Sequence, residues 1–127
     1  MKDIRQNVGK AGEDEACRFL SGQGHTILAR NWRNSHLELD IVSLYGEELH
    51  IVEVKSRTAP VAADPAFNVN KTKRDRLVKA ANAFLNSAEM TPLPKNLDVM
   101  FDVISIVFDR GKTVIDYYPQ AFIPIYS

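Results

Sequence analysis

The segment HLELDIVSLYGEELHIVEVKSR, residues 36–57, decides the fold of this chain. Apolar and polar residues alternate through His36–Leu44 and again through Glu48–Arg57, and this period of two predicts two β-strands. Tyr45-Gly46-Glu47 between them is a turn signal. The segment therefore predicts a β-hairpin.

The register of this hairpin predicts a cluster of charged side chains. A tight turn centred on Gly46-Glu47 pairs Leu44 with Leu49, and counting outward sets Asp40 opposite Glu53. Two facing carboxylates repel by roughly 4 kcal/mol for unit charges at 4 Å near a surface. A shared proton, a nearby cation or a bound divalent metal must offset that repulsion.

Carboxylates at this spacing suit Mg²⁺, which prefers oxygen ligands. Lys55 lies two residues beyond Glu53 on the same face, where it could orient or deprotonate an attacking water. Together with Asp40, these side chains predict metal-assisted hydrolysis of a phosphodiester.

The alternative is a solvent-facing hairpin in which Glu38 and Lys55 form a cross-strand ion pair while Asp40 and Glu53 are merely hydrated. Exposed ion pairs of this kind are common and contribute little stability. Four apolar residues share the face of the charged set and argue against a fully wet surface: Val42, Leu44, Leu49 and Ile51.

Periodicity and turn residues predict the other elements on both sides of the hairpin. In chain order they are a helix at about 9–20, a strand at 26–32, a helix from Lys71 to about Ser87 capped by Asn70, a strand at 97–108 and a strand at 112–118. Residues 58–69 lack periodicity and are expected to form a loop. The order α-β-β-β-α-β-β predicts an α/β fold with helices flanking a mixed sheet, in one domain spanning residues 1–127.

Two further carboxylates fall on apolar faces. Glu13 begins an apolar stripe of the first helix that continues through Ala16, Cys17 and Leu20. It either belongs to the site or lies at the rim of the first turn, where a negative charge favours the helix dipole. Asp102 lies in a strand that is apolar on both faces, so we expect it to be paired with Lys or Arg, bound to metal, or protonated.

The start of the second helix is the most basic stretch of the chain. Its cationic residues are Lys71, Lys73, Arg74, Arg76 and Lys79, against the single acidic residue Asp75. Such a stretch could bind a phosphate backbone or could be a solvated helix face. Because basic charge at a helix start opposes the dipole, we prefer nucleic-acid binding. His25, His36 and His50 lack metal-ligand spacing, and we predict no role for them.

Composition restricts the class of protein. Sixteen basic and 16 acidic residues cancel, which argues against a protein that coats nucleic acid but allows a local basic patch. The single cysteine, Cys17, excludes an internal disulfide and suits a reducing compartment. The N-terminus lacks the apolar stretch of a secretory signal, and no apolar run is as long as a membrane span. We therefore expect a cytoplasmic protein without a membrane partner.

Several motifs, taken in order, resemble the YraN-like family of uncharacterised bacterial proteins. The motifs are GKAGEDEA at 9–16, ILARNWR at 27–33, ELDIV at 38–42 and VEVKSR at 52–57, followed by Lys71, Ala80-Ala81, Phe101-Asp102-Val103 and Ala121-Phe122. That family is similar to archaeal Holliday-junction resolvases and to the restriction-endonuclease-like PD-(D/E)xK nucleases. The similarity covers nearly the whole chain.

The resemblance implies a restriction-endonuclease-like fold and a set of roles at the site. Asp40 and Glu53 would bind Mg²⁺, with Mn²⁺ as an alternative ion, Lys55 would position the water, and Glu13 would join them from the first helix. It also implies a DNA substrate, including branched or junction DNA, and a homodimer, because resolvases of this type act as symmetric dimers.

The leading hypothesis is therefore a Mg²⁺-dependent endonuclease acting on DNA. A non-catalytic nucleic-acid-binding module is the first alternative, motivated by the neutral net charge and by Leu37 and Met100, which stand where the family usually has Gly and Arg. The second alternative is a structural or interaction protein whose paired carboxylates serve stability or protein contacts.

Overall fold

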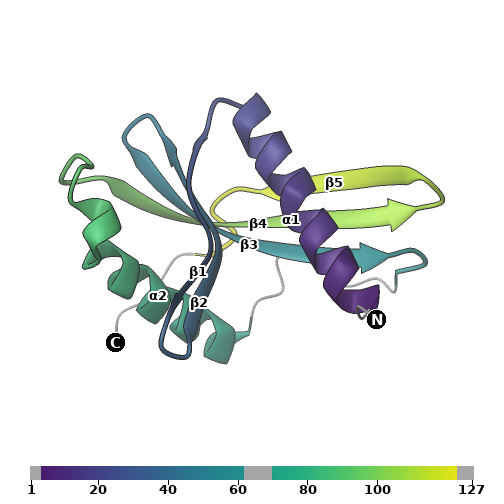
Figure 1. Ribbon diagram of the computed structural model, residues 1–127, viewed down its shortest axis with the longest axis horizontal. Helices are drawn as coiled ribbons and strands as arrows, with labels where there is room; N and C mark the ends of the chain where they lie inside the picture. Colours follow the sequence, from purple (N-terminus) through teal and green to yellow (C-terminus); the bar gives the residue numbers. More distant parts are fainter. Residues whose placement is uncertain (1–3, 62–69, 123–127) are drawn as a thin grey trace.

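The computed structural model describes residues 4–61 and 70–122 (Figure 1). In chain order its elements are α1 (Ile4–Gly22), β1 (Thr26–Asn34), β2 (Leu37–Tyr45), β3 (Glu48–Thr58), α2 (Lys71–Leu85), the short 3₁₀ helix η1 (Ala88–Met90), β4 (Asp98–Asp109) and β5 (Lys112–Tyr118). The predicted mixed α/β order is confirmed, and η1 is an addition to it. Of the predicted loop at 58–69, Thr58 still belongs to β3, and residues 62–69 lie outside the described residues.

The five strands form one sheet in the order β1-β2-β3-β4-β5. Neighbouring strands are antiparallel except β3 and β4, which run parallel. A parallel pair needs a crossover connection, and the segment containing α2 provides it. Neither described helix is long and apolar enough to cross a membrane.

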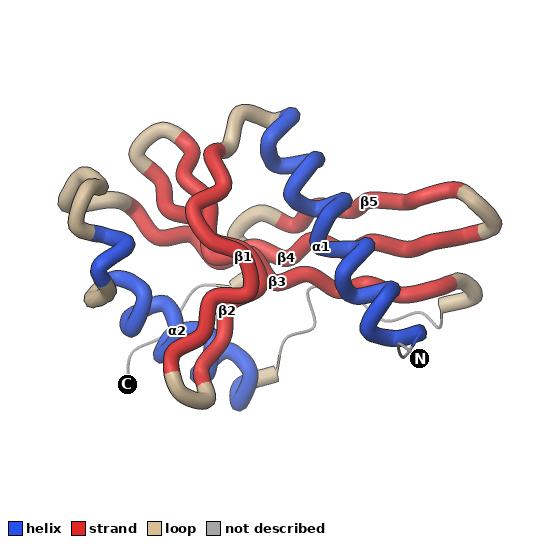
Figure 2. The backbone as a smooth tube through the Cα atoms, viewed as in Figure 1, coloured by secondary structure: helices blue, strands red, loops and turns tan. Residues whose placement is uncertain are grey.

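The two helices cover opposite faces of the sheet, which is strongly twisted (Figures 1 and 2). Adjacent residues of one strand therefore belong to different cores, as alternation requires. Ile41 and Val52 pack with Ala16 and Leu20 of α1. The neighbouring residues Val42 and Ile51 pack instead with α2, against buried side chains that include Leu77 and Phe84. The two cores leave β3 in the centre of the molecule.

The hairpin of β2 and β3 has the predicted register, with Leu44 opposite Leu49 and Tyr45 opposite Glu48. Gly46, in the two-residue turn, has a φ of 58°, a conformation that glycine adopts at little cost. The ladder ends at the pair Ile41 and Val52, one position before the predicted pair of carboxylates. The predicted facing of Glu38 and Lys55 is wrong, because β2 beyond this point pairs only with β1.

Both helices differ from prediction at one end. The first helix begins at Ile4 instead of Gly9, so Gly9 and Gly12 lie within it. Gly12 is required by packing, since a Cβ there would lie 1.7 Å from Ser56 Oγ on β3. The second helix has the predicted cap at Asn70, whose side chain accepts from Lys73 N at 2.9 Å.

The second helix ends at Leu85, two residues earlier than predicted. Its last carbonyl groups are bonded by side chains, because Asn86 Nδ2 donates to Asn82 O and Ser87 Oγ donates to Phe84 O. Such side-chain bonds compete with continuation of the helix.

Candidate active site

A pocket of about 390 Å³ opens between the turn that joins β1 to β2, the end of the β2–β3 ladder and the start of α2. The predicted metal ligands Asp40 and Glu53 line it, together with Lys73 and Arg76 of α2. Carboxylates and cations that are far apart in the sequence therefore meet in one concave place. This pocket is the candidate active site.

Asp40 ends the β2–β3 ladder with its side chain. Its Oδ2 accepts a hydrogen bond from Val54 N at 2.9 Å, two residues beyond Val52, the last residue of β3 that pairs with β2. Burial, followed by the charge of Glu53, raises the pKa of Asp40 to about 7. Glu53 is therefore near enough to act on Asp40, although the β2–β3 ladder ends one position before this pair.

Lys73 is the cation that offsets this repulsion. Its Nζ lies 2.5 Å from Glu53 Oε1, and this ion pair joins the first turn of α2 to β3. The side chain of Glu53 is 12% exposed and that of Lys73 is 45% exposed. Of the compensations expected from the sequence, this structure contains a nearby cation, and the raised pKa of Asp40 favours a retained proton below about pH 7.

Glu13 lies on α1 and is not among the described residues that line the pocket. It lies in the middle of the helix, so the interpretation that placed it in the first turn is wrong. Its Oε2 accepts from Asn31 Nδ2 at 2.8 Å, and its charge contributes to the raised pKa of Asp40. Asn31 has a φ of 50° and lies in β1 between the residues that pair with Leu39 and Ile41, level with Asp40. Sequence reasoning missed Asn31, because a single Asn in a strand gives no signal of this conformation.

The other predicted residues are not all gathered at the pocket. Lys55 is partly buried on β3 but does not line the pocket among the described residues. Lys71 pairs with Asp75 at 3.3 Å, and Arg74 is not among the lining residues. Only Lys73 and Arg76 of the predicted nucleic-acid-binding residues reach the pocket.

The lining also includes His36, Asn70 and Thr72, for which no chemical role was predicted. Glu38 lines the pocket too, but its ion pair is with Arg33 at 3.4 Å rather than with Lys55. The predicted cross-strand pair is therefore replaced by a pair to β1. His36 lies in the short β1–β2 connection, whereas alternation had placed it at the start of the strand.

The carboxyl groups of Asp40 and Glu53 are lining groups that could hold a divalent ion. Across residues 4–61 and 70–122, no group of three or more His, Cys, Asp or Glu side chains is arranged to hold a metal. Mg²⁺ does not require one, since it keeps several waters and is bound by one or two carboxylates plus substrate phosphate oxygens. Binding such an ion would require the ionised form of Asp40, whose pKa is raised to about 7.

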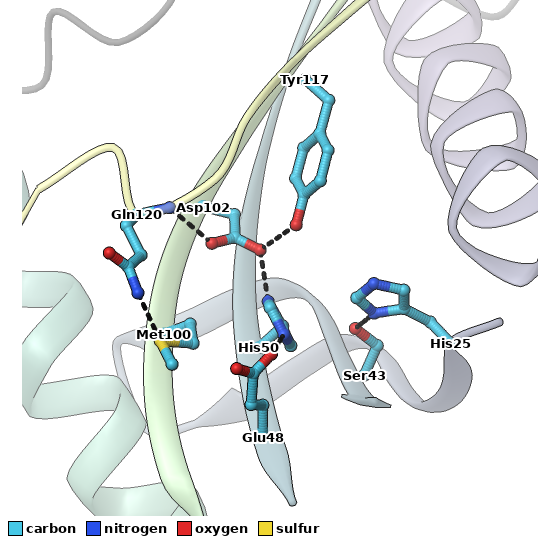
Figure 3. A network of polar contacts seen from close by, with 8 residues as sticks. All are labelled: His25, Ser43, Glu48, His50, Met100, Asp102, Tyr117 and Gln120. Atoms are coloured by element: carbon cyan, nitrogen blue, oxygen red, sulfur yellow. Dashed lines mark hydrogen bonds and ion pairs between the residues drawn. The ribbon is translucent and has the colours of Figure 1, made fainter. Parts of the chain in front are cut away.

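A second polar cluster lies on the α1 face of the sheet (Figure 3). The carboxylate of Asp102 accepts from Tyr117 Oη at 2.6 Å and from Gln120 N at 2.9 Å, and it lies 2.5 Å from His50 Nδ1. The expected Lys or Arg partner of Asp102 is therefore wrong: the partners are a histidine, a tyrosine and a backbone amide. His50 also contacts Glu48 Oε1 through Nε2 at 2.9 Å. His50, for which the sequence predicted no role, is therefore the centre of a buried network.

Similar proteins share nearly the full length of the chain. The family described as "Uncharacterised protein family UPF0102" matches residues 12–106. A UPF0102 protein of Nitratidesulfovibrio vulgaris is 45% identical over 123 residues, which cover 96% of this chain and 88% of the relative. A UPF0102 protein of Bacteroides thetaiotaomicron is 39% identical over 117 residues, covering 92% and 93%. One from Myxococcus xanthus is 36% identical over 118 residues, covering 93% and 90%.

Proposed function

We propose a nuclease function for this chain, which belongs to the UPF0102 family. The proposed reaction is Mg²⁺-dependent hydrolysis of DNA phosphodiester bonds. The observation that carries the proposal is the opposed pair Asp40 and Glu53, in a pocket that also contains cationic side chains of α2. Burying two carboxyl groups together destabilises the folded state and perturbs their pKa values, and such perturbed groups cluster at functional sites.

The side chains divide into those that hold the ion and those that act on the substrate. Asp40 and Glu53 would hold Mg²⁺ or Mn²⁺, which when bound polarises the phosphodiester and neutralises the charge that develops on it. Glu13, fixed by Asn31, adds negative potential beside them. In this proposal, Lys55 orients the attacking water.

The substrate contacts follow from charge. Lys73 and Arg76 line the pocket and would bind the phosphates next to the scissile bond, while Lys71 and Arg74 lie on the same helix and would extend the contact. We propose duplex DNA as the substrate class, with branched or junction DNA as its specific form. A symmetric homodimer would present two pockets to such a substrate.

The test begins with calorimetric titration of Mg²⁺ and Mn²⁺ into the wild type, Asp40→Ala and Glu53→Ala, followed by incubation with linear and branched DNA. We expect the wild type to bind metal and cleave, and both variants to lose binding. Glu38→Ala is the matched control, because it removes an exposed carboxylate of the same pocket that pairs with Arg33. Equal metal binding in the wild type and both variants would contradict the site assignment.

A non-catalytic DNA-binding module is the second candidate function. Lys55 lies outside the pocket lining while Lys73 and Arg76 are part of it, so the described pocket has more groups for binding phosphate than for activating water. This function predicts salt-sensitive DNA binding that Lys73→Ala and Arg74→Ala weaken, with no cleavage under any metal. If the wild type binds neither metal nor DNA, both candidates fail and a structural role remains.

A further inference from the structure

The ion pair between Lys73 and Glu53 involves the same carboxylate that the proposed function assigns to the metal. Lys73 Nζ lies 2.5 Å from Glu53 Oε1, a distance at which the ammonium group donates a charge-assisted hydrogen bond. Two cations cannot share this position without mutual repulsion. A divalent ion that binds Glu53 therefore competes with Lys73.

We propose that Lys73 is a positioning residue. When the metal binds, its ammonium group leaves the carboxylate of Glu53 and binds a substrate phosphate. The inference rests on the proposed function, since it assumes that Glu53 is a metal ligand. Without metal, Lys73 holds Glu53 against the carboxyl group of Asp40. With metal, the ammonium group is released within the pocket, next to Arg76, where a phosphodiester can take the place of the carboxylate.

The geometry allows the ammonium group of Lys73 to leave Glu53 without a change in the backbone of α2. The backbone of Lys73 is fixed in the first turn of α2, because its N–H donates to the Asn70 cap at 2.9 Å. Its side chain is 45% exposed and flexible, so the ammonium group can move while the helix stays in place. The lysine end of this ion pair is open to solvent, so a divalent ion can displace the ammonium group into solvent or onto a phosphate.

The other two cations, Lys71 and Arg76 of α2, form no described ion pair with Glu53. Lys71 pairs with Asp75 at 3.3 Å, one turn along the same helix. Arg76 lines the pocket, but within the described residues it forms no ion pair with Glu53. Lys73 is thus the cation through which metal occupancy is linked to phosphate binding, and linkage makes the effect reciprocal.

The first experiment is Mn²⁺ titration, without DNA, into the wild type, Lys73→Ala and Arg76→Ala. Removing the competitor should tighten Mn²⁺ binding in Lys73→Ala by about two- to fivefold, the factor expected for a partly exposed ion pair. Arg76→Ala removes the same charge from the same pocket without freeing Glu53, so its effect should be smaller. Equal affinities in Lys73→Ala and the wild type would overturn the inference.

The second experiment measures duplex DNA affinity by stopped-flow anisotropy, with and without Mg²⁺, before cleavage can occur. Lys73→Ala should bind DNA as the wild type does without Mg²⁺ and about fivefold more weakly with it. Weakening that is equal in both conditions would overturn the inference but leave the nuclease proposal intact. Failure of the wild type to bind any metal would overturn both, so the two failures are distinguishable.

Discussion

At the residue scale, Asp40 is subject to two opposing effects. The hydrogen bond from Val54 N favours its charged form, whereas burial and the charge of Glu53 favour its protonated form. The second effect prevails, since the pKa of Asp40 is raised to about 7. At pH 8 and without metal, the folded protein therefore contains an ionised carboxylate that the unfolded chain solvates better.

This raised pKa predicts the stability of Asp40→Asn. An unfolded Asp loses its proton near pH 3.9, so between about pH 4 and 7 only the folded state keeps it, and wild-type stability falls as pH rises. The amide removes that penalty and can still accept from Val54 N. We expect Asp40→Asn to be more stable than the wild type by about 2 kcal/mol at pH 8, with the difference shrinking toward pH 4.

Urea unfolding in the presence of a chelator measures this difference. Glu38→Gln is the control on the same strand, since its carboxylate is exposed and paired with Arg33. An Asp40→Asn variant no more stable than the wild type at pH 8 would contradict the raised pKa of Asp40.

At the element scale, the position of α1 depends on its closest approach to β3. Gly12 faces Ser56 so closely that a Cβ would lie 1.7 Å from Ser56 Oγ and 2.6 Å from Ser56 Cβ. Glu13 follows directly in the chain, so the same approach places this carboxylate near Asp40. The glycine therefore positions a helix and, through it, part of the candidate site.

Two alanine substitutions in α1 are expected to have opposite effects. Gly12→Ala should destabilise the protein by about 2 kcal/mol or more, because the added methyl group overlaps Ser56 and the helix must shift. Gly9→Ala has no atom within 4 Å of its new Cβ and should stabilise the helix by about 0.5–1 kcal/mol. Thermal unfolding measures both, and Ser56→Gly should restore the Gly12→Ala variant. Similar effects at the two positions would contradict the close approach.

The hairpin was predictable from sequence because its determinants are local. A two-residue turn at Gly46 sets the register of β2 on β3, and that register runs to Ile41 and Val52, the residues next to Asp40 and Glu53. The contact between Lys73 and Glu53 was not predictable, since residues 58–69, which lack clear periodicity, separate the strand of Glu53 from the helix of Lys73. The partners of Asp102 were missed for a related reason: alternation indicates which face a side chain takes but not which neighbouring strand supplies its contacts.

At the scale of the whole molecule, the sheet separates two polar systems. The pocket lies on the α2 side, where Lys73 and Arg76 meet the carboxylates. The network of His50 and Asp102 lies on the α1 side and joins β3, β4 and β5 (Figure 3). Because the network is buried, we expect pH to act on its contribution to stability, as pH does on that of Asp40 in the pocket.

The direction in which the pKa of His50 shifts determines how this contribution to stability changes with pH. Burial lowers the pKa, but hydrogen bonds and charge from Asp102 and then Glu48 outweigh burial and raise it. Tyr117 Oη donates to the same Asp102 oxygen, and the rings of His25 and Tyr45 also face His50. A histidine whose pKa is raised by folding stabilises the folded state. This contribution is complete below the pKa of the unfolded state, about 6.5, and is lost as pH rises through the pKa of the folded state.

Replacing each histidine should therefore change the pH dependence of unfolding in opposite directions. His50→Gln breaks a buried charge pair and should cost about 3 kcal/mol at pH 6, with the deficit narrowing toward pH 9 as wild-type His50 loses its proton. Burial, and then the charge of His50, lower the pKa of His25, so His25→Gln should instead become relatively more favourable as pH falls. Urea unfolding at pH 6 and pH 9 compares the three proteins. A His50→Gln deficit that stays constant between these pH values would mean that His50 acts as a neutral hydrogen-bond donor, and the charged pair with Asp102 would be wrong.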